Sequence, residues 1–209
     1  MEESKIKEKW SDLLFGVRRT IRYHTHRRKF FDKLSVWSDF LIIISGGTVV
    51  GFASSSETGH RAWTILFGAL VAVLGSFDLV IGFSNKARDY HDLAREFSVL
   101  ERQITAATDA RTKENLILFS NKRLEIEENE PPILQVLNCY CDNELIKALG
   151  LPRNEMVKIT FCQSLFKQWF DLNPTSLVKY KDLETKKTES NLKSTANTSK
   201  PQPVAMPQP

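Results

Sequence analysis

The spacing of apolar residues predicts an amphipathic helix at the start of the chain. Between Ser4 and about His24, apolar residues recur at steps of three or four, which is the repeat of one helical face. These residues are Ile6, Trp10, Leu13, Val17 and Ile21. Such a face requires a partner surface, because water is a poor environment for a continuous apolar stripe.

Two long, nearly uncharged segments follow. Residues Val36 to Ser54 contain Asp39 as their only formal charge, and Ala62 to Phe83 contain only Asp78. About nineteen helical residues cover roughly 28 Å, close to the thickness of the hydrocarbon core of a bilayer. The connector Ser55 to Arg61 is short and turn-like, so the pattern predicts two antiparallel transmembrane helices.

A second apolar seam follows the membrane segments. Its residues alternate in steps of three and four, which is the a/d pattern of a helical seam. They are Tyr90, Leu93, Phe97, Leu100, Ile104 and Ala107. Thr108-Asp109 interrupts the pattern, and a second helix is expected from Thr112 to about Glu127 as its antiparallel partner. The residues expected to point inward from that helix are Leu116, Phe119 and Leu124.

Two further helices are expected before the chain loses its apolar pattern. Pro131-Pro132 separates the acidic end of one helix from a third, Ile133 to Leu149, which Gly150 and Pro152 close. A fourth covers Glu155 to Phe170, with a stripe formed by Val157, Phe161, Leu165 and Trp169. Beyond Asp182 the composition is polar, so a disordered tail is expected.

These patterns predict an all-α membrane protein, with a two-helix transmembrane hairpin, a long exit helix and a cytoplasmic helical bundle. The expected regions are an N-terminal amphipathic juxtamembrane helix (1–33), the transmembrane hairpin (34–84), a cytoplasmic helical region (85–181) and the disordered tail (182–209).

The distribution of charge favours a membrane over nucleic acid as the partner. The net charge is +4, but much of the excess lies just before the first apolar segment, where cations set membrane topology. The run Arg27-Arg28-Lys29 is a candidate headgroup contact. Cations flank the outer ends of both spans, and the connector has only Arg61. Both termini are therefore expected in the cytoplasm, with the hairpin in a bacterial inner membrane.

Candidate chemistry is sparse. Three cysteines, Cys139, Cys141 and Cys162, cannot all form disulfides with one another, and reduced thiols fit a cytoplasmic location. The histidines share no ligand spacing with the cysteines, and no glycine-rich phosphate loop or catalytic triad stands out. We therefore expect no metal, no cofactor and no enzymatic activity.

Glycines form two small-residue faces within the predicted spans. Gly47-x-x-x-Gly51 lies in the first span, and Gly68, Gly75 and Gly82 recur at steps of seven along the second. Small residues allow close approach of helices in membranes. They either pack the hairpin against itself or form contacts between copies in a homo-oligomer. A single hairpin has one internal seam, so two glycine faces leave one for another copy.

Two carboxylates within the spans are candidate functional residues, because a charge in a span costs about 3 kcal/mol on insertion scales. Asp39 is expected near the cytoplasmic boundary, where it can pair with Lys33 or Arg28. Asp78 is expected deeper in the second span. It either hydrogen-bonds within the protein or lines a cation path in an oligomer.

The order of these features resembles the SLATT family of bacterial two-transmembrane effector domains. The resemblance covers roughly Lys9 to Trp169. It rests on Trp10, the motif Arg18-Arg19-x-x-Arg22-Tyr23-His24-x-x-Arg27-Arg28, the hydrophobic hairpin, the exit-helix sequence Ala87-Arg88-Asp89-Tyr90-His91, and Pro131-Pro132 followed by Asn143-Glu144.

This resemblance implies a membrane effector of antiphage or conflict systems that forms a pore or disrupts the inner membrane when a partner signals infection. The partners it implies are a nucleotide-signalling enzyme, a nucleotide-binding SLOG protein or a reverse transcriptase. The alternative is a passive membrane anchor or scaffold that recruits a soluble partner through its cytoplasmic helices.

Overall fold

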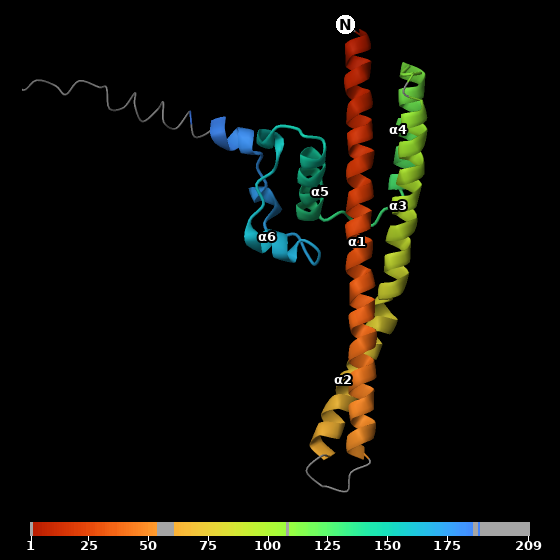
Figure 1. Ribbon diagram of the computed structural model, residues 1–209, viewed down its shortest axis with the longest axis vertical. Helices are drawn as coiled ribbons and strands as arrows, with labels where there is room; N and C mark the ends of the chain where they lie inside the picture. The colour runs from red at the N-terminus through yellow and green to blue at the C-terminus, as the bar shows by residue number, and fades with distance from the viewer. Residues whose placement is uncertain (1, 54–60, 108, 186–187, 189–209) are drawn as a thin grey trace, which may run out of the picture. The chain divides into compact units, whose positions relative to one another are not determined.

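The computed structural model describes residues 2–53, 61–107, 109–185 and 188. The described chain is all-α, and its only β feature is an isolated antiparallel bridge between Val157 and Lys179. It divides into two compact units, Met1–Ile133 and Leu134–Pro209. The N-terminal unit contains α1 (Glu2–Ala53), α2 (Arg61–Ile81), α3 (Phe83–Ala106) and α4 (Lys113–Glu127) (Figure 1). The C-terminal unit contains α5 (Gln135–Ala148), η2 (Arg153–Glu155), α6 (Phe161–Phe166) and η3 (Pro174–Ser176).

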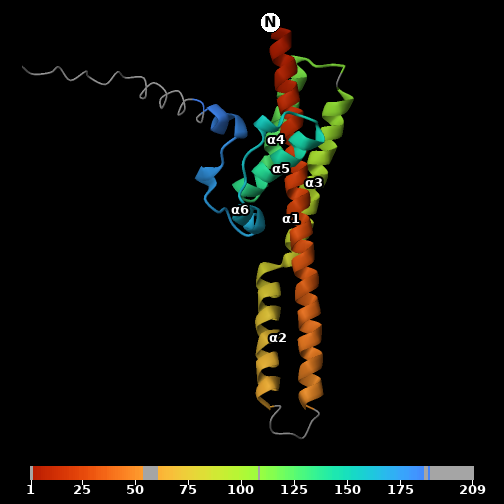
Figure 2. The same cartoon turned by 60° about the vertical axis from the view of Figure 1, so that its left-hand side comes forward.

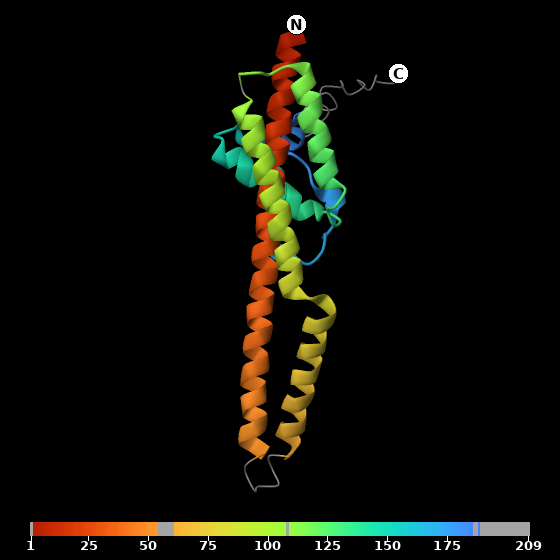
Figure 3. The same cartoon turned by 90° about the vertical axis from the view of Figure 1, so that its right-hand side faces the viewer.

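One continuous helix, α1, forms the axis of the N-terminal unit. Its 52 residues join the predicted amphipathic helix to the predicted first span without the expected boundary near residue 33. The reason is local, since the segment contains no proline and its glycines are too few to end a helix. In Figures 2 and 3, α2 lies along the C-terminal half of α1, and α3 lies along its N-terminal half.

Gly82 separates α2 from α3. Its φ of 61° and ψ of 57° lie in the left-handed region, which glycine adopts without steric cost. The backbone then re-enters a helix, with Lys86 N–H donating to the Gly82 carbonyl at 2.9 Å. The chain turns at this point (Figure 3), so the exit helix is a separate helix and not a straight continuation of the second span.

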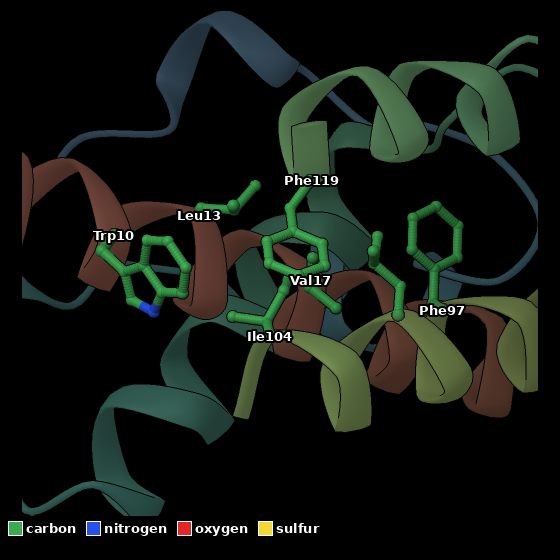
Figure 4. Packing of buried hydrophobic residues seen from close by; sticks show 7 residues of the cluster. Trp10, Leu13, Val17, Phe97, Ile104 and Phe119 are labelled. Atoms are coloured by element: carbon green, nitrogen blue, oxygen red, sulfur yellow. The ribbon is translucent and has the colours of Figure 1, made fainter. Parts of the chain in front are cut away.

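The buried core of this unit joins three helices. Trp10, Leu13 and Val17 of α1 pack with three α3 residues and with Phe119 of α4 (Figure 4). The α3 residues are Phe97, Leu100 and Ile104. Trp10 and Phe119 meet edge to face with ring centroids 5.8 Å apart. Both predicted apolar stripes are therefore buried, and each supplies the other with a partner surface.

One residue of α4 was assigned to the wrong face. Leu124 was expected to point inward, but its side chain is 58% exposed, and Ile126 packs against the core instead. A helix turns by about 100° per residue. Position 126 therefore lies nearly below Phe119, whereas position 124 is displaced from it by roughly 140°.

The fourth predicted helix is also shorter than expected. Its predicted span was Glu155 to Phe170, but α6 covers only Phe161–Phe166, because Val157 lies in the β-bridge and Thr160 caps the helix. The preceding helix ends as predicted, at Gly150 with a φ of 66°. The predicted disordered tail begins at Asp182; residues 180–185 are helical, and residues 189–209 of that tail lie outside the described chain.

Candidate membrane hairpin and buried polar sites

The distal half of the α1–α2 hairpin exposes large apolar side chains on its outer surface. Ile43 is 72% exposed and Val80 is 84% exposed. The others on this surface are Val36, Trp37, Phe40, Leu41, Ile44, Val50, Trp63, Ile65, Leu66, Leu70 and Val73. A contiguous apolar surface of this kind marks a protein or membrane contact, since soluble monomers rarely expose one.

Length and composition support a membrane for α1. Within the described residues, one helix is long and apolar enough to cross a membrane, and it is Glu3–Gly51. Among the described residues of α2, the apolar stretch Ala62–Ser76 is shorter. The candidate first span therefore lies in α1. A second span would require nearly all residues of α2, because the stretch Ala62–Ser76 alone is shorter than the span in α1.

Two hydroxyl side chains of α1 are buried within the hairpin. Ser38 and Ser45, seven residues apart on one face of α1, are both buried. Two small hydroxyl groups are thus buried, together with partly buried apolar side chains such as Ile42 and Leu74, while many large apolar side chains of the same helices are exposed. Small and hydroxyl side chains are the residues that let membrane helices approach each other and form hydrogen bonds.

The candidate helix-packing glycines of the two apolar segments face open space in a single chain. A Cβ atom added at Gly47, Gly51, Gly68 or Gly75 would meet no neighbouring atom within 4 Å. These four positions therefore do not mediate close packing between α1 and α2. Gly82 has a different role from the other glycines, because it forms the left-handed turn between α2 and α3.

Of the two candidate carboxylates, the structure describes the side chain of Asp39 but not that of Asp78. Asp39 is exposed on α1. Asp78 lies within α2, and its side chain is outside the described part of the chain. Arg28, one of the expected partners of Asp39, instead contacts the Asp32 carboxylate at 3.4 Å and the His91 ring at 2.9 Å.

A buried histidine joins the middle of α1 to the chain that leaves α4. His24 Nε2 lies 2.9 Å from Glu130 Oε1, and the two side chains are 0% and 5% exposed. The rings of Tyr23, Tyr90 and Phe97 surround the imidazole at centroid distances of 5.4 to 5.8 Å. Burial of a polar pair is tolerated only when its members bond to each other, so this contact fixes the position of Glu130 along α1.

Other members of the basic motif also link α1 to α3. Arg18 Nε donates to Glu101 Oε1 at 2.6 Å. The Arg27 guanidinium lies 4.7 Å from the Phe31 ring centroid and 5.2 Å from that of Tyr90, a cation–π arrangement. Of the three candidate headgroup contacts, Arg28 and Lys29 are exposed, whereas Arg27 is directed into this aromatic cluster.

The C-terminal unit is held together by side-chain bonds that sequence reasoning did not identify. The Asn143 amide donates to the Val157 carbonyl and accepts from its N–H, at 2.7 and 2.8 Å. Thr160 and Gln163 form a capping box at the start of α6. The Thr160-x-x-Gln163 spacing is a recognisable signal for a helix start, whereas nothing in the local sequence pairs Asn143 with Val157.

A surface cavity of about 590 Å³ lies within the same unit. Tyr140, Glu144, Lys147 and Arg153 line it. Burial and the neighbouring Glu144 carboxylate raise the pKa of the Tyr140 hydroxyl above its ordinary value. The cavity lining offers groups of both charges.

Comparison of the chain with family models, with curated proteins and with solved structures gave no match.

Proposed function

We propose that this protein is an integral membrane effector with a two-helix hairpin, α1 and α2, that crosses the bacterial inner membrane. The observation that carries the proposal is the surface of the hairpin, on which many large apolar side chains are exposed while Ser38 and Ser45 are buried. At 1.5 Å per residue, the 21 residues of α2 extend about 31 Å, which matches the hydrocarbon core of a bilayer.

The active form in this proposal is a homo-oligomer that permeabilises the membrane. The open surfaces at Gly47 and Gly51, and at Gly68 and Gly75, support it, because another helix can approach closely where no side chain intervenes. Asp39 and Asp78 are the proposed polar groups of the aqueous path. The trigger is a signalling partner, as in the SLATT family that the sequence resembles.

A glycine substitution tests the contact between copies without disturbing the single chain. Gly47→Leu places its side chain in space that is empty in the monomer, so we expect normal membrane abundance with loss of cross-linked oligomers and of depolarisation. Gly46→Leu is the matched control, because its Cβ also meets nothing in the monomer and it lies off the Gly47-x-x-x-Gly51 face. Equal depolarisation by the parent and Gly47→Leu contradicts the glycine contact.

Membrane potential tests the effector function itself. Triggered expression of the parent is expected to collapse the potential, measured with a voltage-sensitive dye. Asp78→Asn keeps the shape of the side chain and removes its charge, so it is expected to weaken cation passage at equal protein level. If the parent leaves the potential intact, the effector proposal fails.

A passive membrane anchor is the alternative. The polar cavity of the C-terminal unit, with Glu144, Lys147 and Arg153 in its lining, favours it, because such a cavity is suited to a recruited ligand or peptide. An anchor needs no oligomer. Membrane insertion without oligomers and without depolarisation supports the anchor over the effector.

A further inference from the structure

The C-terminal unit exposes an apolar face on α6 and the turn that follows it. Phe161 is 81% exposed and Leu165 is 60% exposed. Phe166, Trp169 and Phe170 are also exposed, and the Phe166 and Phe170 rings stack with centroids 5.4 Å apart. The sequence pattern predicted only that Phe161 and Leu165 share one helical stripe, and their exposure is a finding of the structure. We call these five residues the aromatic face.

The aromatic face lies next to the point where the chain enters its unit. Asp171, which directly follows Phe170, accepts hydrogen bonds from the backbone N–H groups of Gln135 and Val136 at 2.8 and 2.9 Å. Two bonds to the first turn of α5 hold the end of the face beside that helix start. The face is therefore tied to the first residues of the C-terminal unit.

The entry point in turn lies near the expected membrane boundary. The contact between His24 and Glu130 fixes Glu130 at the level of His24 on α1. Ten helical residues, or about 15 Å, separate His24 from position 34, where the expected hairpin region begins. The C-terminal unit starts at Leu134, only four residues beyond Glu130, so chain length limits its first residue to within about 14 Å of Glu130.

The charge of the neighbouring sequence suits a bacterial membrane surface. Residues 152–181 contain five cationic side chains and two carboxylates. Glu155 is already bound to Lys179 and Lys181, and Asp171 caps α5. The other cations are Lys158, Lys167 and Arg153; Lys167 Nζ lies 4.0 Å from the Tyr140 ring centroid, and the Arg153 guanidinium lies 5.6 Å from that of Tyr180. Aromatic side chains beside cations are typical of segments that bind the lipid interface.

We propose that the aromatic face is a second membrane contact, at which the C-terminal unit rests on the cytoplasmic lipid surface of the same bilayer. Phe161, Leu165 and Phe170 enter the headgroup region, and the nearby cations attract anionic lipids. This contact rests on the proposed membrane hairpin, since the hairpin holds the unit at the surface.

Spin labelling of the full chain tests the contact. Cys162 lies on the aromatic face and is exposed, while Cys141 is buried. In a Cys139→Ser background, a nitroxide on Cys162 is placed in vesicles of phosphatidylcholine and phosphatidylglycerol. We expect stronger collisions with dissolved oxygen than with a water-soluble nickel chelate. The double variant Phe161→Ser, Phe170→Ser is expected to lose this preference for oxygen. In vesicles of phosphatidylcholine alone, the preference of the parent label is expected to be weaker.

Two reference labels, each in a background with Cys139 and Cys162 replaced by serine, separate failure of this contact from failure of the hairpin. Ile43→Cys reports hairpin insertion, and Leu149→Cys reports an exposed apolar position elsewhere in the C-terminal unit. The label at Leu149→Cys is expected to report an aqueous environment. If the Cys162 label also reports water while the Ile43→Cys label reports lipid, the surface contact is wrong and the membrane hairpin is supported. If Ile43→Cys reads water, both proposals fail. A Cys162 label shielded from both reagents means that protein covers the face, which also overturns the lipid contact.

Discussion

His24 and Glu130 lie 106 residues apart in sequence, yet their side chains meet at 2.9 Å in the interior of the N-terminal unit. The contact connects the middle of the longest helix to the residue that precedes Pro131-Pro132. It therefore sets the point at which the chain leaves this unit.

The first prediction concerns that contact. Glu130→Ala leaves the buried His24 imidazole without its partner, and we expect a loss of stability on the order of 2–4 kcal/mol. Glu130→Gln retains a hydrogen-bonding group and is expected to lose less. Thermal unfolding of the full chain in detergent measures both. Asp32→Ala, which removes an exposed pair with Arg28, is the control and should change stability by less than about 0.5 kcal/mol.

The second prediction separates two leucines that the sequence pattern treats alike. Leu100 is buried in the core, whereas Leu124 is exposed. Leu100→Asp is expected to lose about 3 kcal/mol or more, because it buries an unpaired charge. Leu124→Asp should unfold at nearly the parent temperature. Equal melting of Leu100→Asp and the parent contradicts the core assignment.

The third prediction concerns two glycines of the second apolar segment. Gly82→Ala places a Cβ at a left-handed φ of 61°, which costs roughly 1 kcal/mol. Gly75→Ala lies within α2, where the added methyl group meets nothing, so it should not destabilise the monomer. Unfolding of the two variants, compared at low protein-to-detergent ratio, measures the difference; a Gly82→Ala variant as stable as Gly75→Ala contradicts the turn.

The fourth prediction is topological. Reporter fusions at Glu57, in the connector outside the described residues, are expected to read periplasmic, and fusions at either terminus are expected to read cytoplasmic. The reason is the excess of Lys and Arg at the outer ends of both apolar segments. A periplasmic C-terminus excludes the hairpin topology.

The fifth prediction is a pH dependence. Hydrogen bonds from Lys179 and Lys181 lower the pKa of the Glu155 carboxyl group below its ordinary value of 4.5. A lowered folded-state pKa gives stability that is present above the ordinary value and is lost as pH falls through the folded-state value. The parent should therefore lose stability relative to Glu155→Gln as pH falls below about 4.5. Parallel melting curves of the two proteins across this range contradict the prediction.

The sequence alone predicted most residues of the N-terminal core. Trp10, Leu13 and Val17, and likewise Phe97, Leu100 and Ile104, repeat with the helical period, and burial follows from that period because one face of each helix must leave water. It also located the end of α5 at Gly150, where glycine accommodates a positive φ. These features depend on neighbours along the chain, so local pattern suffices.

Tertiary structure decided the features that depend on residues far apart in sequence. The His24–Glu130 contact, the direction of Arg27 and the Asn143–Val157 bonds all join segments whose pairing no local spacing specifies. The same holds for the aromatic face, since Phe161 and Leu165 have the period of a buried stripe yet remain exposed. The apolar repeat predicts that one face of a helix is apolar. Whether that face is buried, and against which residues, depends on how the rest of the chain packs.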